Sequence, residues 1–235
     1  MIDLKGYGPE LAQGAVVTVE LALLSLLLAL FLGLTGAAAK LSASRVARTV
    51  ATVYTTLVRG VPDLVMMLLL YYGGQVMVNN LSDWLYEQYN IDWFFQFDPF
   101  ISGVLTIGLI FGAYMAETFR GAFLAVETGQ IEAARAYGFT QWHTFRRVMV
   151  PQMMRHALPG IGNNWQVLLK TTALVSIIGL TDMVRVAEEA AKAERSPFLF
   201  FIPVAAVYLA LTAVSELFIK WLNRRANVGV VQGEG

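Results

Sequence analysis

The chain has no cysteine and only two histidines among its 235 residues. Without cysteine it forms no disulfide, thiolate nucleophile, iron–sulfur cluster or Cys-type zinc site, and two histidines argue against a His-rich metal site. Lys and Arg total 17 and so do Asp and Glu, so there is no overall basic charge to attract nucleic acid. Neither GxxxxGK[ST] nor HExxH occurs. The sequence therefore predicts no enzyme, and no metal ion or cofactor bound by this chain.

Hydrophobic residues, in contrast, make up 57% of the chain, and charged residues only 14%. Soluble domains have about 45–50% apolar and about 25% charged residues, so this surplus predicts an integral membrane protein. A membrane-spanning helix needs about 20 apolar residues. Five segments qualify, and they predict an all-α protein with a single transmembrane domain over 1–235; the spans are expected at about 13–39, 49–78, 100–124, 158–178 and 198–222. Gly60 and Pro62 are expected to interrupt the second of these spans.

The distribution of basic residues predicts the orientation of these spans. Most Lys and Arg residues fall after the first span, after the third and in the tail, whereas the loop 79–99 has none and carries four acidic residues. Basic loops stay in the cytoplasm. We therefore expect a periplasmic N-terminus, a periplasmic loop 79–99 and a cytoplasmic C-terminus. Within the third span, Gly108 and Gly112 form a GxxxG pattern that favours close helix packing.

The cytoplasmic segment 127–157 is the most informative part of the sequence. Residues 130–137 are rich in alanine, Gly138 is suited to end a helix, and Thr140 can cap the next one, which Pro151 is expected to interrupt. The first helix carries small residues that would let another protein approach its backbone closely. A solvated loop without a partner remains the alternative.

This segment resembles the EAA signature of type I ABC-importer permeases. The matching residues keep the spacing of that signature: Glu132-Ala133-Ala134, Gly138, Val148, Val150 and Pro151. Further stretches resemble the polar amino-acid uptake permeases, and most closely the Q-type subunit of histidine and lysine–arginine–ornithine or arginine/ornithine systems; they are 59–64, 116–121, 129–134, 151–159 and 170–176. Val61, Asp63 and the Lys170–Ala173 stretch differ from the residues commoner in the broad family.

The resemblance implies a permease subunit of an ATP-driven importer for basic amino acids in a bacterial inner membrane. It implies three partners besides the lipid bilayer: a second, homologous permease chain in a pseudo-two-fold heterodimer, a dimeric ATPase that binds the ATP and Mg, and a periplasmic binding protein. The residues expected to couple the chain to the ATPase are Glu132, Ala133, Ala134, Tyr137, Gly138 and Phe139.

Charged and polar residues within the spans are costly and often mark transport pathways. Asn163, Gln166 and Lys170 share one helix face and predict either a pathway lining or hydrogen bonds between helices. Glu20 predicts a pathway carboxylate, an ion pair with Lys170, or a position at the outer edge of the membrane in contact with water. A local pair with Lys220 is expected for Glu216.

Two further groups of charged residues have a local interpretation. Glu117 and Arg120 are spaced for an intrahelical pair. Asp182 opens a stretch that is expected to lie outside the membrane, within reach of a partner.

Pairs such as Glu20 and Lys170 also suit a proton or ion relay, so an ion-driven secondary transporter or channel subunit without an ATPase is the alternative function.

Overall fold

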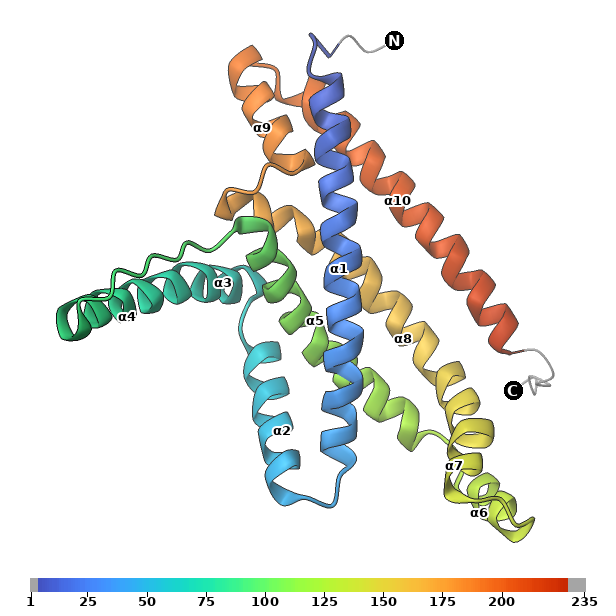
Figure 1. Ribbon diagram of the computed structural model, residues 1–235. Helices are drawn as coiled ribbons and strands as arrows, with labels where there is room; N and C mark the ends of the chain where they lie inside the picture. The colour runs from blue at the N-terminus through green and yellow to red at the C-terminus, as the bar shows by residue number, and fades with distance from the viewer. Residues whose placement is uncertain (1–3, 228–235) are drawn as a thin grey trace.

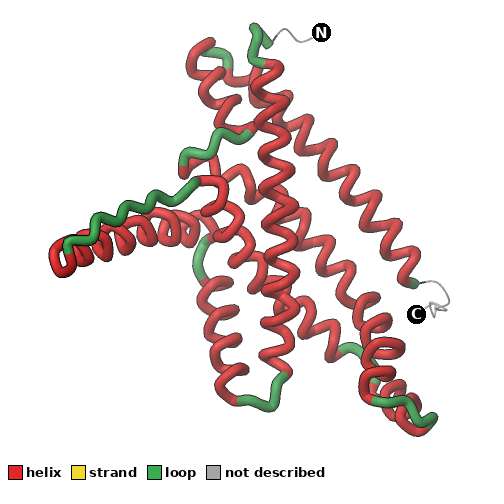
Figure 2. Tube along the Cα trace, viewed as in Figure 1, coloured by secondary structure: helices red, strands yellow, loops and turns green. Residues whose placement is uncertain are grey.

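The computed structural model describes residues 4–227, and within that range the chain is helical or in turns, with no strand (Figure 2). The helices are α1 (Gly8–Leu41), α2 (Arg45–Gly60), α3 (Asp63–Leu68), α4 (Gly74–Tyr89), α5 (Pro99–Leu124), α6 (Thr128–Ala136), α7 (Gln141–Thr144), α8 (Val150–Thr171), α9 (Met183–Glu194) and α10 (Pro197–Ala226). Two π-helical turns, η1 (Leu69–Gly73) and η2 (Phe145–Met149), and one 3₁₀ stretch, η3 (Thr172–Ile178), join them.

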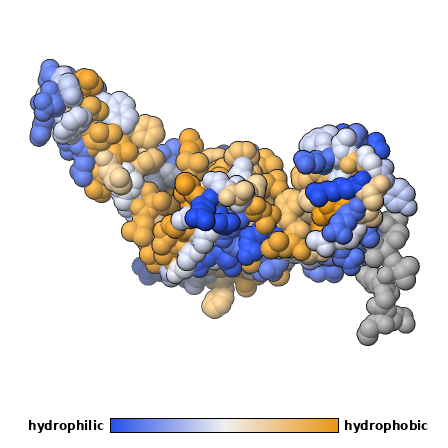
Figure 3. All heavy atoms as spheres, turned by 90° about the horizontal axis from the view of Figure 1, so that it is seen from below, coloured by the Kyte–Doolittle hydropathy of each residue, from blue (hydrophilic) through white to orange (hydrophobic). Residues whose placement is uncertain are grey.

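In the described part of the chain, four helices are long and apolar enough to cross a membrane, or five if the segment 141–178 and α9, which meet at a 53° bend, form one broken span. The all-helical membrane architecture predicted from composition is therefore confirmed. Apolar side chains also cover much of the surface (Figure 3), with hydrophilic ones gathered over the α1–α2 turn and over α6 and α7. Surface of this kind is stable when lipid covers it.

The packing centre of the bundle is the contact between α1 and α5. A Cβ atom added at Gly108 would lie 2.5 Å from Leu28 Cδ2, and one at Gly112 would lie 2.8 Å from Leu32 Cβ. The absence of side chains at these two positions lets α1 approach α5 closely. The GxxxG prediction for the third span is thus confirmed, and its partner is the first span.

The second expected span, 49–78, is interrupted at Gly60 and Pro62, as the sequence predicts. It breaks after Gly60, where Val61 is extended at φ −108° and ψ 138°, and a new helix starts after Pro62. The residue before a proline is pushed out of the helical region by the proline ring, which explains the break. Helix α3–η1–α4 then projects sideways from the bundle (Figure 1).

The expected loop 79–99 is also shorter than the sequence suggested. Helix α4 continues to Tyr89 and ends at Asn90, which has the left-handed φ of 55°. Residues 90–98 run back along the helix (Figure 1), held by Gln75, whose Nε2 donates to the Phe95 carbonyl oxygen at 2.9 Å. Asp98 then caps α5 by accepting from the Ile101 amide at 2.8 Å.

Candidate functional site

The segment α6–α7–η2 forms the end of the molecule opposite the N-terminus of α1 and α9 (Figure 1). Helix α6 closes with Gly138 at φ +80°, whose amide donates to the Arg135 carbonyl oxygen at 2.9 Å. Thr140 then accepts from the His143 amide at 3.3 Å and caps α7. The Gly138 turn and the Thr140 cap are both confirmed. The expected interruption at Pro151 is wrong, because this proline lies in the first turn of α8, where a helix tolerates it.

Most side chains at the α6–α7 turn are exposed, whereas Ala134 of α6 and Thr144 of α7 are buried. Tyr137 is 86% exposed and Trp142 63%, unusually high for aromatic side chains. Glu132, Ala133, Gly138 and Phe139 are exposed as well. Ala134 is buried, so the small-residue face expected for α6 is only partly free. The exposed residues give this turn an aromatic surface.

The second feature is a groove of about 360 Å³ between α8 and α10, here called the α8–α10 groove. It is lined by Pro159, Gly162, Asn163, Gln166, Lys170, Glu216, Ile219, Lys220 and Asn223. The polar stripe predicted on the fourth span therefore lies on one surface and faces charged residues of the last helix. Lys220 Nζ lies 2.8 Å from Glu216 Oε1, which confirms the expected local pair.

Two oxygen atoms of the α8–α10 groove are buried without a hydrogen-bond partner among the described residues: Gln166 Oε1 and Asn223 Oδ1. The amide of Gln166 donates only through Nε2, to the Thr212 carbonyl oxygen at 3.4 Å. Unsatisfied acceptors are costly unless water or a ligand donates to them. Asn223 was missed in the sequence, although Glu216, Lys220 and Asn223 follow the i, i+4, i+7 spacing of one helix face.

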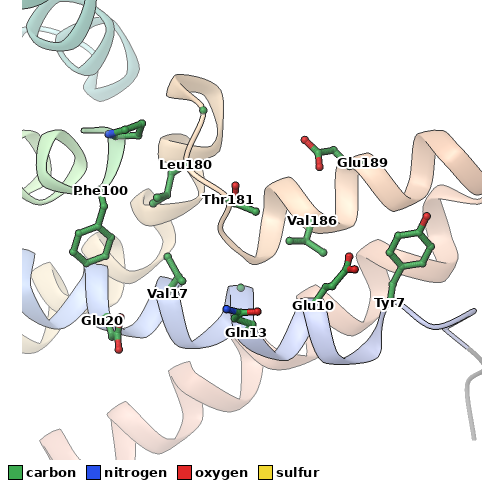
Figure 4. A pocket seen from close by; sticks show the side chains of 13 residues that line it. Tyr7, Glu10, Gln13, Val17, Glu20, Phe100, Leu180, Thr181, Val186 and Glu189 are labelled. Carbon is green, nitrogen blue, oxygen red and sulfur yellow. The ribbon is translucent and has the colours of Figure 1, made fainter. Parts of the chain in front are cut away.

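Glu20 does not belong to this groove. It lines a separate, wider groove of about 680 Å³ beside α9, together with Glu10 and Glu189 (Figure 4). Figure 4 shows Glu20 at one end of this groove, with its carboxyl group on the side of α1 away from Leu180 and Thr181. Within residues 4–227, no ion pair joins Glu20 to Lys170. The structure thus separates Glu20 from the α8 stripe.

Asp182 also differs from its expected role as an accessible outer residue. Its side chain is fully buried where α9 begins, and Oδ1 accepts from the Arg185 amide at 2.9 Å. Oδ2 has no hydrogen-bond partner in the described part of the chain. Burial raises the pKa of Asp182 to about 6, against the opposing effect of the Arg185 amide. The amphipathic stretch that begins at Asp182 gave no sign of this burial.

Over residues 4–227 there is no group of three or more His, Asp or Glu side chains placed to hold an ion.

The family model for binding-protein-dependent transport system inner membrane components matches residues 15–228. The chain belongs to this family. It is therefore a non-catalytic, multi-pass component of an inner-membrane transport system. Dependence on a binding protein decides against the alternative of an ion-driven carrier or a channel.

Individual relatives are similar in sequence to this chain over nearly its whole length. The permease protein HisQ of the histidine/lysine/arginine/ornithine transport system of Salmonella typhimurium is 52% identical over 98% of this chain and 99% of its own length. The HisQ protein of Escherichia coli K12 is 50% identical over the same shares. The octopine transport permease OccQ of Rhizobium radiobacter is 38% identical over 97% of this chain and 94% of its own.

Two solved structures support the fold. A crystal structure of an amino acid ABC transporter with histidines matches at a TM-score of 0.77 and 32% identity, covering 93% of this chain and 95% of that one. An inward-facing MetNI methionine ABC transporter matches at a TM-score of 0.69, covering 92% of this chain and 95% of that one. Its sequence identity is 14%, so this similarity shows the fold alone. The ABC permease fold is therefore established.

Proposed function

We propose that this chain is one of two permease subunits of an ATP-driven importer for basic amino acids. The observation that carries the proposal is the exposed α6–Gly138–α7 turn, which forms one end of the molecule and presents Tyr137 and Phe139 to a partner. The names of the relatives with 52% and 50% identity supply the substrate class of histidine, lysine, arginine and ornithine. ATP and Mg are bound by a separate ATPase dimer.

In the proposed orientation the exposed turn lies in the cytoplasm, and the N-terminus of α1 and helix α9 lie in the periplasm. The basic residues at the α1–α2 turn, along η2 and at the end of α10 support this orientation through the positive-inside rule. It places the wide groove beside α9 on the side from which a binding protein delivers substrate.

The coupling role is assigned to Glu132, Ala133, Tyr137, Gly138 and Phe139, which are the exposed ones among the six residues expected to couple the chain to the ATPase. Ala134 supports the turn from inside, because it is buried. Closure of the ATPase dimer would push on this turn, and α8 follows it directly through η2. Motion of the turn therefore shifts the helix that carries Asn163, Gln166 and Lys170.

The α8–α10 groove is the proposed part of the pathway on this chain. Its unsatisfied oxygens at Gln166 and Asn223 are acceptors for an ammonium or guanidinium group, and Lys170 supplies a cation for a carboxylate. The second permease chain would complete the cavity on the open side of the groove. Glu20 belongs to the periplasmic entrance in this proposal, because its groove lies at the other end of the molecule.

The orientation can be tested separately from transport, since the chain has no cysteine. Single-cysteine variants Glu132→Cys and Glu188→Cys are treated in intact cells with a membrane-impermeant maleimide. Labelling of Glu188→Cys alone agrees with the proposal, whereas labelling of Glu132→Cys in intact cells contradicts it.

Transport is tested in vesicles that contain the two permease chains and the ATPase, with the binding protein added outside. Labelled arginine, histidine, lysine and ornithine should enter only with ATP inside and binding protein outside. Ala133→Trp should abolish uptake while the complex still inserts, because the bulky side chain blocks the exposed face of α6. Uptake at the wild-type rate by Ala133→Trp would count against the coupling role.

A further inference from the structure

A third groove, of about 500 Å³, lies between the end of α1, the end of α5 and the π-helical turn η2; we call it the apolar groove. It is lined by Leu34, Ala38, Leu41, Phe123, Leu124, Phe145 and Met149. Every one of these side chains is apolar. Two walls belong to the central α1–α5 packing of the bundle, and the third belongs to the segment proposed to receive the ATPase.

The walls of this groove are not covered by other parts of the chain. Leu34, Leu124 and Phe145 are all exposed among the described residues. Exposed apolar surface costs about 25 cal/mol per Å² in water. In a membrane-spanning chain such a concave apolar surface is therefore occupied by lipid chains or by another protein.

Basic residues near the apolar groove distinguish between lipid and protein as its occupant. Arg120 precedes Phe123 and Leu124 by three and four positions on α5, so it lies on the same helix face as these two groove residues. Arg146 directly follows Phe145 and is exposed, and Arg45 begins α2 just after Leu41 and the short turn. Arginine is the side chain best suited to binding phosphate oxygens with two parallel hydrogen bonds.

From this arrangement we infer that the apolar groove binds an anionic phospholipid of the cytoplasmic leaflet. One acyl chain lies between Leu34, Ala38 and Phe145, and the phosphate group lies against Arg120 and Arg146. The inference rests on the orientation proposed above. A lipid in this position contacts both the membrane bundle and η2, so it stiffens the connection through which the ATPase moves α8.

The test uses the intact complex of both permease chains with the ATPase. The complex is placed in nanodiscs of phosphatidylcholine alone or of phosphatidylcholine with phosphatidylglycerol, and retained phosphatidylglycerol is counted by native mass spectrometry after extraction. Ala38→Phe fills the groove from α1. Leu27→Phe adds a ring at another exposed position of the same helix, which is 63% exposed and outside the groove, and serves as the matched control.

The wild-type complex and Leu27→Phe should retain phosphatidylglycerol and hydrolyse ATP faster in its presence. Ala38→Phe should lose both effects, and Arg146→Gln should weaken retention about fivefold, the factor for one basic residue near an anionic surface. If Ala38→Phe does not assemble, Leu124→Ser makes the exposed wall polar and should also lose the lipid.

Equal retention by the wild type and Ala38→Phe would overturn the inference, and so would a cross-link from Ala38→Cys to a helix of the companion permease. Failure of the orientation itself is recognised separately by maleimide labelling of Glu132→Cys in intact cells. A complex with the proposed orientation and no retained phosphatidylglycerol therefore contradicts the lipid site alone.

Discussion

Lys40 at the end of α1 forms an ion pair with Glu117 of α5, 77 residues away in the sequence. The same ammonium group donates to Thr55 Oγ1 of α2 at 2.6 Å. The local pair expected for Glu117 is present as well, with Arg120 Nε at 3.5 Å. One carboxylate thus connects three helices close to the break after Gly60, and Arg59 Nη1 approaches it at 4.0 Å.

Glu117→Gln should lower the free energy of unfolding by about 2 kcal/mol, because Lys40 is only 9% exposed and loses its charged partner. The measurement is the unfolding midpoint in mixed detergent micelles. Glu216→Gln is the matched control, since Glu216 and Lys220 are both more than half exposed and such pairs contribute at most about 1 kcal/mol. Equal effects of the two substitutions would contradict the connecting role of Glu117.

Gly138→Ala should impair transport without destabilising the helix bundle. A Cβ at Gly138 meets no atom within 4 Å, but its φ of +80° costs about 1–2 kcal/mol for any residue with a side chain. The turn between α6 and α7 is therefore distorted, and more ATP should be hydrolysed per amino acid taken up by the vesicles. Gly129→Ala adds the same methyl group within α6, also without a neighbour within 4 Å, and should transport normally.

The features that the sequence predicted well depend on local chemistry. Long apolar runs, the Gly108–Gly112 pair and the turn at Gly138 each follow from neighbouring residues along one helix or one turn. The polar stripe on α8 is also a local pattern, and the structure adds only its counterpart on α10. Such features need no knowledge of which helices meet.

The burial of Asp182 was not predicted, because it depends on tertiary packing. The break in the segment 49–78, in contrast, is a local effect that the sequence predicts from Gly60 and Pro62, since the proline pushes Val61 out of the helical region. An Asp in a polar stretch was read as exposed, yet the close approach of α1 at Gly14 buries the backbone around Asp182 and Met183. Only the three-dimensional path of α1 past α9 reveals this burial.

Asp182 makes stability depend on pH. Its pKa is raised from 3.8 to about 6 in the folded chain, so the folded state binds the proton more tightly than the unfolded chain. The stability of the wild type should therefore be greatest below about pH 4 and should fall by up to about 3 kcal/mol as the pH rises through about 6.

Asp182→Asn removes this titration and keeps an oxygen that can accept from the Arg185 amide. Its unfolding temperature should change little between about pH 5 and about pH 8, whereas that of the wild type falls. Asp92→Asn, in the exposed loop 90–98, should keep the wild-type pH dependence. A wild-type unfolding temperature that rises over this range would contradict the assignment.

Gly108→Ala tests the closest contact between α5 and α1. The new methyl group would lie 2.5 Å from Leu28 Cδ2, so Leu28 or the helix must move, at a cost of about 1–3 kcal/mol. Gly121→Ala, on the same helix, is the control, because its new methyl group meets no atom within 4 Å. At both positions alanine favours a helix over glycine by about 1 kcal/mol. The difference in unfolding midpoint between the two variants thus isolates the packing cost. Leu28→Ala should recover part of the loss in the Gly108→Ala background, because it removes Cγ and Cδ2, the two closest of the three Leu28 atoms in contact, and leaves only Cβ at 2.9 Å. No recovery would mean that α1 packs against α5 elsewhere.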